Sequence, residues 1–208
     1  MRSRPQSPAR AARRSLLRVA LSGLAGLAAL TLEASLLAAP ASAQPQPAAG
    51  PAALERSVKA AFIYKFLGYT EFPPHAFGDA GAPVVIGVAG SDEMAAELAR
   101  VVSGRTVNNR PLVVKQWRDG ESTGAVHLLF VAGADSAQVA RVLRQAPAGP
   151  VLLVTECGNG LQAGAIINFK IVEERVRFDV SLDAADKNNI KLSSRLLTVA
   201  NHVSKGAP

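Results

Sequence analysis

The chain has 208 residues, 49% of them hydrophobic, and a formal net charge of +7. Residues 1–43 hold six arginines and one glutamate, so the remainder carries 17 basic and 15 acidic residues and a net charge of only +2. This near balance gives no electrostatic case for nucleic-acid binding, and the remaining 165 residues suffice for one domain with its own core.

The N-terminal segment, 1–43, has the composition of a secretory signal peptide. A basic start without acidic residues is followed by an apolar stretch at 16–30 and by Ala41-Ser42-Ala43, which has small residues at the two positions that a signal peptidase recognises. The apolar stretch is about 15 residues long, shorter than the ~20 that a membrane-spanning helix needs, and Glu33 follows it. We therefore predict export to the periplasm with cleavage after Ala43, in preference to an uncleaved membrane anchor. Arg13-Arg14 resembles a twin-arginine signal, which leaves the export route open, with the general pathway as the default.

The next segment, 44–53, is rich in Pro, Ala and Gln, a composition typical of a linker. One domain is expected over 54–204, with a short tail at 205–208. It opens with a helix over 54–69, where apolar residues recur at three- and four-residue spacing until Pro73-Pro74 ends the pattern.

Strands and helices then alternate along the chain. The predicted strands are 83–89, 112–117, 126–131 and 151–155, and the predicted helices are 92–102, capped by Ser91, and 137–145, capped by Ser136. Because the strand runs are apolar on both faces, they favour parallel strands that are covered on both sides.

A two-residue alternation of apolar and polar side chains predicts an antiparallel hairpin over 165–182. If Glu173-Glu174 forms the turn, Ile171 faces Val176, Phe169 faces Phe178 and Ile167 faces Val180, so one face of the hairpin is apolar. Glu-Glu is unfavourable in a tight turn, so a four-residue loop in the same register is the alternative.

The C-terminal part is predicted to be helical. A short helical turn is expected at 184–188, and Ser193 is expected to cap a final helix with Leu196, Val199, Ala200 and Val203 on its inner side. The predicted fold class is therefore α/β: a single domain with a mixed, mostly parallel sheet flanked by helices, a C-terminal antiparallel hairpin and a final helix.

One motif matches the nucleophile elbow of hydrolases. Residues 120–124 read Gly-Glu-Ser-Thr-Gly, and Asp135 and His202 follow Ser122 in triad order. The elbow must join a strand to a helix, however, whereas this segment joins two predicted strands, so a polar turn is the favoured interpretation and we predict no catalytic residues.

Other candidate sites are also weak. The glycine-rich segment 158–164 precedes a strand rather than a helix, which favours a strand connection over a phosphate cradle. His75, His127 and His202 lack metal-site spacing, and His127 lies in an apolar strand, so we predict no metal and no cofactor. The lone cysteine, Cys157, is expected to be buried, with pairing between two chains as the alternative.

Two groups of short motifs carry a family resemblance. The first is Val-Lys-Ala-Ala-Phe-Ile-Tyr-Lys-Phe at 58–66 followed by Thr-Glu-Phe-Pro at 70–73, and the second is Ile-Asn-Phe at 167–169, Val-Arg-Phe-Asp-Val at 176–180 and Leu-Ser-Ser-Arg-Leu-Leu at 192–197. Together they resemble the YfiR family, periplasmic regulators of membrane diguanylate cyclases, in which Trp often stands where this chain has Phe72. The likeness covers nearly all of 54–204.

The resemblance implies a small α/β domain that is usually a homodimer. Such a protein would bind the periplasmic domain of an inner-membrane diguanylate cyclase and hold it inactive, which lowers cyclic-di-GMP and biofilm formation. An OmpA-like outer-membrane lipoprotein can sequester such a regulator. Better-known relatives have internal disulfides, which a chain with Cys157 alone cannot form.

Inhibition needs no reactive groups, only a preference for the inactive conformation of the cyclase. The candidate contact residues lie on two predicted surfaces. One is the outer face of the hairpin, which also includes Arg175, and the other is the polar side of the last helix. Lys170 opposite Arg177 is unfavourable for folding but would suit an acidic patch on a partner. For any single residue an ordinary solvated face is the simpler interpretation. The candidate partner-binding residues are Asn168, Lys170, Arg177, Asp179, Lys191 and Arg195.

The alternative function is a periplasmic module that binds and senses a small molecule, such as an amino acid or a nucleotide. A bound ligand without a captured protein partner would favour this alternative.

Overall fold

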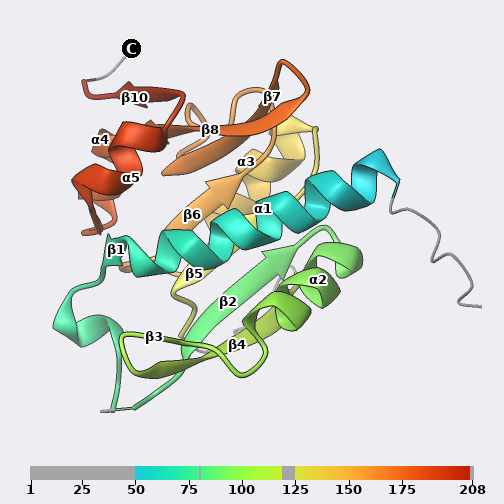
Figure 1. Cartoon of the computed structure of the whole chain (residues 1–208). Coiled ribbons are helices and arrows are strands. Elements are labelled where there is room, and N and C mark those ends of the chain that lie inside the picture. Colours follow the sequence, from blue (N-terminus) through green and yellow to red (C-terminus); the bar gives the residue numbers. More distant parts are fainter. Residues whose placement is uncertain (1–49, 80, 119–124, 207–208) are drawn as a thin grey trace, which may run out of the picture. The chain divides into compact units, whose positions relative to one another are not determined.

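The computed structural model describes residues 50–79, 81–118 and 125–206. An eight-stranded sheet dominates this part of the chain, and a separate two-stranded ladder joins β1 (Thr70–Glu71) to β9 (Lys191–Leu192) (Figure 1). The order of the large sheet is β10 (His202–Ser204), β8 (Arg175–Ser181), β7 (Ile167–Val172), β6 (Leu152–Thr155), β5 (Leu128–Val131), β2 (Val84–Ala89), β4 (Arg110–Trp117) and β3 (Thr106–Val107).

Helices lie on both faces of this sheet. The described helices are α1 (Pro51–Gly68), the short 3-10 helix η1 (Pro74–Ala76), α2 (Asp92–Val102), α3 (Ser136–Gln145), α4 (Leu182–Lys187) and α5 (Ser194–Val199). The path from β2 through α2 to β4 runs one way along the sheet, and the path from β5 through α3 to β6 runs the other way. Because parallel crossovers are right-handed, α2 and α3 lie on opposite faces, and α1 lies beside α2 (Figure 1). The predicted α/β fold class is confirmed.

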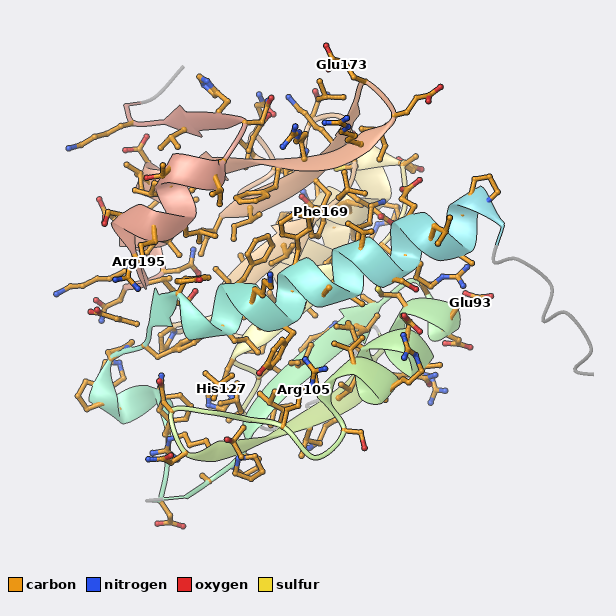
Figure 2. All side chains as sticks on the ribbon, in the orientation of Figure 1. Glu93, Arg105, His127, Phe169, Glu173 and Arg195 are labelled. Carbon is orange, nitrogen blue, oxygen red and sulfur yellow. The ribbon has the colours of Figure 1, made fainter. Side chains whose placement is uncertain are left out.

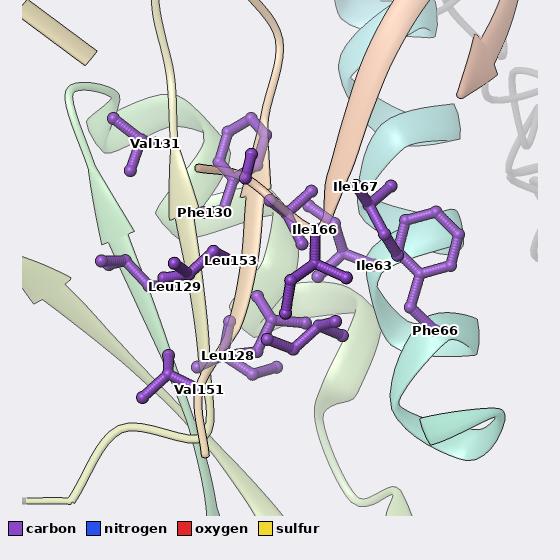
Figure 3. Close-up of a cluster of buried hydrophobic side chains, with 14 of the residues drawn as sticks. Ile63, Phe66, Leu128, Leu129, Phe130, Val131, Val151, Leu153, Ile166 and Ile167 are labelled. Atoms are coloured by element: carbon purple, nitrogen blue, oxygen red, sulfur yellow. The ribbon is translucent and has the colours of Figure 1, made fainter. Parts of the chain in front are cut away.

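The strands β2, β5 and β6 are buried along their whole length, as their continuous apolar runs predicted. Side chains of α1 fill the space above the sheet, where Ile63 and Phe66 lie beside Ile166 and Ile167 (Figure 3). The ring of Phe66 packs edge-on against Phe178 at 4.9 Å between centroids. The helix α1 therefore holds the β7–β8 hairpin against the sheet.

An ion triad fixes α1 at a second point. The ammonium group of Lys59 lies 2.5 Å from Glu55 Oε1 and 2.6 Å from Glu156 Oε2, and Glu156 Oε1 accepts a hydrogen bond from the Gly133 amide. Burial alone would lower the pKa of Lys59, but the hydrogen bonds and charges of Glu156 and Glu55 outweigh it and raise this pKa above its usual value. The triad thus ties α1 to the loops that follow β5 and β6.

The hairpin has the predicted register. Ile171 pairs with Val176, Phe169 with Phe178 and Ile167 with Val180. The two-residue turn is also confirmed, because Glu173 and Glu174 have φ angles of 48° and 58°, the left-handed values that a type I′ turn requires.

Four details differ from the prediction. Asp135, rather than Ser136, caps α3, because its carboxylate accepts from the Ala137 and Gln138 amides. The final helix begins at the Ser193 cap but ends at Val199, which is exposed, so Val199 and Val203 do not form its inner side. Residues 202–204 instead form β10, whose parallel ladder with β8 satisfies the backbone there. The helix α1 begins at Pro51, within the segment that was predicted to be a linker.

His127 is a satisfied core histidine, as predicted. Its Nδ1 accepts from the Val85 amide at 3.0 Å, and its Nε2 lies 3.0 Å from the Ala76 carbonyl oxygen, which identifies the neutral ring with the proton on Nε2. Burial lowers the pKa of His127, and the charge of Arg110 adds to this effect, whereas the hydrogen bond to Ala76 opposes it.

The His127 environment predicts a loss of stability in mild acid. An unfolded chain binds a proton on this ring near pH 6.5, and the folded chain does so only at lower pH. The free energy of unfolding should therefore be fully retained above about pH 6.5 and should fall as the pH drops through the lowered folded pKa. Urea denaturation between pH 8 and about 5 measures this slope.

The control is a matched pair of histidine variants. His127→Gln should flatten the slope, whereas His75→Gln should leave it unchanged because His75 is exposed. Equal slopes in the wild type and His127→Gln would contradict the assignment.

Candidate functional site

The β7–β8 hairpin has two chemically different faces. Phe169 and Phe178 lie on the face that packs against α1, where both rings also contact Phe62. The opposite face carries four predicted contact residues, since side chains alternate along each strand. These four residues are Asn168, Lys170, Arg177 and Asp179.

Two of the four are buried, contrary to the prediction of an exposed outer face. Asn168 is 1% exposed and Asp179 is 2% exposed. Asn168 Oδ1 accepts from the Thr155 hydroxyl at 2.7 Å, and Asn168 Nδ2 donates to the Cys157 carbonyl at 2.9 Å. Asn168 therefore orders the connection between β6 and β7, because its amide is satisfied by this connection and not by solvent.

Asp179 is held by the C-terminal part of the chain. Its Oδ1 accepts from Asn201 Nδ2 at 2.7 Å, and its Oδ2 lies 2.5 Å from the ammonium group of Lys170. The backbone N–H of Asn201 also donates to the Phe178 carbonyl at 2.8 Å, just before β10 begins. β10 and the glycine-rich loop 158–164 therefore cover polar groups that the two-residue alternation alone would expose.

A hollow of about 370 Å³ lies on this face, between the glycine-rich loop and β10. Its walls include both charged and neutral polar groups. The polar side chains that line it include Asn168, Lys170, Asp179, Ser181, Asp183 and His202. The hollow could hold a small polar ligand, although Asn168 is satisfied within the protein and Asp179 is bound to Lys170 and Asn201.

The cations of the hairpin divide into paired and unpaired ones. Lys170 and Arg177 are cross-strand partners, but Lys170 turns to Asp179, which neutralises its charge. Within the described part of the chain, the guanidinium groups of Arg175 and Arg177 have no acidic partner, and both residues are exposed. Val172, cross-strand from Arg175, is 36% exposed. We call Val172, Arg175 and Arg177 the basic hairpin edge.

The other two predicted contact residues lie elsewhere. Lys191 is exposed on β9 opposite Glu71 of β1, and Arg195 is exposed in the first turn of α5. Figure 2 shows Arg195 well separated from Glu173 at the hairpin turn. Arg195 therefore does not share a surface with the hairpin turn (Figure 2).

The hydrolase motif is only partly described by the structure. Ser122 lies outside the described residues. Asp135 caps α3 and lines a hollow beside Gly133 and Gln138, whereas His202 lies in β10 beside the hollow on the hairpin. Asp135 and His202 therefore belong to different parts of the surface.

The remaining motifs have structural roles. The segment 158–164 connects two strands, as predicted, and Cys157 is buried with a free thiol, also as predicted. Among the described residues, no three metal-ligating side chains cluster and no helix has the length and hydrophobicity to cross a membrane. The predicted signal peptide lies outside the described residues.

Sequence reasoning missed Thr155 and Asn201, the partners of the buried polar groups. Thr155 ends an apolar strand and Asn201 lies within the predicted final helix, so neither position shows that a side chain must satisfy a buried amide or carboxylate.

The sequence profile of the YfiR/HmsC-like family matches residues 56–201. The match begins within α1 and ends just before β10, so it includes the whole hairpin. No curated protein sequence matches the chain.

The packing of Gly160 predicts how this face is held in shape. A Cβ atom at residue 160 would lie 2.1 Å from Thr155 Oγ1 and 2.3 Å from Asn168 Oδ1, within the buried hydrogen-bond pair. Gly160→Ala should therefore reduce the free energy of unfolding by about 1–3 kcal/mol, which chemical denaturation measures. Gly158→Ala is the matched control, since a Cβ there meets nothing within 4 Å. Equal stability of the two variants would show that the loop does not depend on this close contact.

Proposed function

The chain belongs to the YfiR/HmsC-like family, and from this membership we propose that it is a periplasmic negative regulator of an inner-membrane diguanylate cyclase. In this proposal it is exported with cleavage after Ala43, binds the periplasmic domain of the cyclase and favours the inactive conformation. The consequences are lower cyclic-di-GMP and less biofilm. The proposal includes a homodimer and sequestration by an OmpA-like outer-membrane lipoprotein.

The observation that carries the proposal is the basic hairpin edge. Arg175 and Arg177 are exposed and lack acidic partners among the described residues, and Val172 adds apolar area beside them. Arginine next to exposed apolar area is typical of protein interfaces, because its guanidinium binds carboxylates in a planar, bidentate way. We therefore propose that the cyclase presents an acidic patch with an apolar centre to this edge.

We propose other roles for the remaining candidate residues. Asn168 and Asp179 stabilise the hairpin next to the basic hairpin edge, since both are buried and their polar groups are hydrogen-bonded within the protein. Lys170 positions Asp179 and contributes less charge to a partner. Lys191 and Arg195 are exposed outside the hairpin, and we assign them to a second partner such as the lipoprotein.

A second candidate function rests on the hollow beside the hairpin. Its volume of about 370 Å³ and its polar walls suit a small polar molecule, and it adjoins Lys170 and Asp179. A thermal-shift screen of the exported protein separates the two functions: a large shift with a small molecule and no capture of a cyclase would favour the sensing module.

Charge reversal tests the proposed cyclase contact. Arg177→Glu places an acid against the proposed acidic patch, so the dissociation constant for the periplasmic domain of the cyclase should rise at least about tenfold, or about 1.4 kcal/mol. Isothermal titration calorimetry measures this change. Circular dichroism should show an unchanged fold, because residue 177 is exposed.

The matched control is Arg144→Glu, which makes the same charge change at an exposed position on α3. It should leave the affinity unchanged. If both variants bind like the wild type, the basic hairpin edge is not the contact surface.

A further inference from the structure

Most of one edge of β4 pairs with no other strand among the described residues. Its inner edge pairs with β2 from Leu112 to Trp117, whereas its outer edge pairs with β3 only at Arg110 and Pro111. Among the described residues, none continues the ladder along the outer edge beyond Pro111. An edge of this length offers a row of backbone donors and acceptors to another strand.

The side chains of β4 alternate between two environments. Leu112 and Val114 are half-buried and pack against the core, whereas Val113 and Lys115 are exposed. Val113 is 38% exposed, which is high for a valine in a strand. Lys115 is the one charged residue from Leu112 to Gln116, and there is no proline in this stretch, so the edge has little protection against strand pairing.

We infer that β4 pairs with β4 of a second copy, in antiparallel orientation, about a two-fold axis at Val114. This inference rests on the homodimer of the proposed function and specifies its interface. A two-fold axis requires the same surface on both copies, and identical antiparallel strands satisfy this condition.

The chemistry of the strand selects the register. With the axis at Val114, Leu112 faces the partner's Gln116 and Val113 faces the partner's Lys115, so no like charges lie directly opposite each other. An axis at Lys115 would place two ammonium groups opposite each other, and an axis at Val113 would bring Pro111 into the ladder, where β3 already pairs. An axis between two residues would pair core-facing positions of one strand with exposed positions of the other, so core-facing side chains would lie on the exposed face.

The register also explains the exposed valine. The aliphatic stem of the partner's Lys115 would cover Val113 on the open face of the sheet, while the two copies of Val114 would meet on the face that packs against the core. Two eight-stranded sheets would then continue into one, which removes the unpaired edge of β4 in both copies.

A charge pair tests this register. In V113K the new lysine faces the partner's Lys115 twice in each dimer, so the dimer dissociation constant should rise at least about tenfold. In V113K/K115E each of these pairs becomes a lysine opposite a glutamate, which should restore the wild-type constant. Sedimentation velocity of the full exported protein at concentrations up to about 100 μM measures all three constants.

Cysteine cross-linking is the second measurement and does not depend on how charges affect folding. In V114C the two thiols meet at the axis, at a Cα separation that allows a disulfide, so mild oxidation should give a covalent dimer. V199C is the control, since Val199 is exposed on α5 far from β4 in the chain, and the native Cys157 is buried. V199C should remain a monomer on a non-reducing gel.

The outcomes separate the interface from the homodimer itself. A monomeric wild type at the highest concentration would overturn both. A wild-type dimer that is unchanged in V113K and gives no V114C cross-link would overturn the β4 interface and leave the homodimer proposal standing. Loss of the dimer in V113K without rescue in V113K/K115E would overturn the register.

Discussion

The packing of α1 against the β7–β8 hairpin is the contact on which the rest of the structure depends. Phe62 and Phe66 of the helix contact Phe169 and Phe178 of the hairpin. The ring centroids of these four pairs are 4.9 to 6.2 Å apart. This contact joins α1 to β7 and β8, so it packs segments that lie about 100 residues apart in the sequence against each other. Aromatic groups of this size dominate core energetics, since each buries a large apolar area. The contact also decides which face of the hairpin points away from the core.

The face of the hairpin that points away from α1 carries its polar and charged side chains. Its inner part is buried by the glycine-rich loop and by β10, which hold Asn168 and Asp179 in hydrogen bonds. Its outer part, toward the turn, stays exposed and ends in Arg175 and Arg177. The β7–β8 hairpin therefore has an inner part whose buried polar groups are hydrogen-bonded and an outer part that is charged and exposed. A docking surface benefits from this arrangement, because contact residues on a rigid element lose little entropy when a partner binds.

Much of this fold could be predicted from the sequence, because burial leaves a periodic pattern. The hairpin register followed from the alternation of Ile167, Phe169 and Ile171, and the parallel strands followed from continuous apolar runs. The burial of the opposite face could not be predicted, since a two-residue period shows which side chains share a face but not whether another segment covers it. The end of α5 was missed for a similar reason: Val203 fits helical spacing, but its backbone gains a parallel ladder with β8. The short ladder of β1 and β9 has two residues in each strand, too few to leave any pattern.

The central claim is that this protein acts by docking the outer part of its hairpin onto a cyclase. Hydrogen–deuterium exchange of the full protein, with and without the periplasmic domain of the cyclase, tests this claim most directly. Residues 170–178 include the turn and the parts of both strands that lie beyond the ladders with β6 and β10, so amides there that are outside the β7–β8 hydrogen bonds exchange readily unless a partner covers them. Binding of the cyclase domain should slow exchange in this segment and leave exchange in α3 unchanged. Protection elsewhere with no change in 170–178 would contradict it.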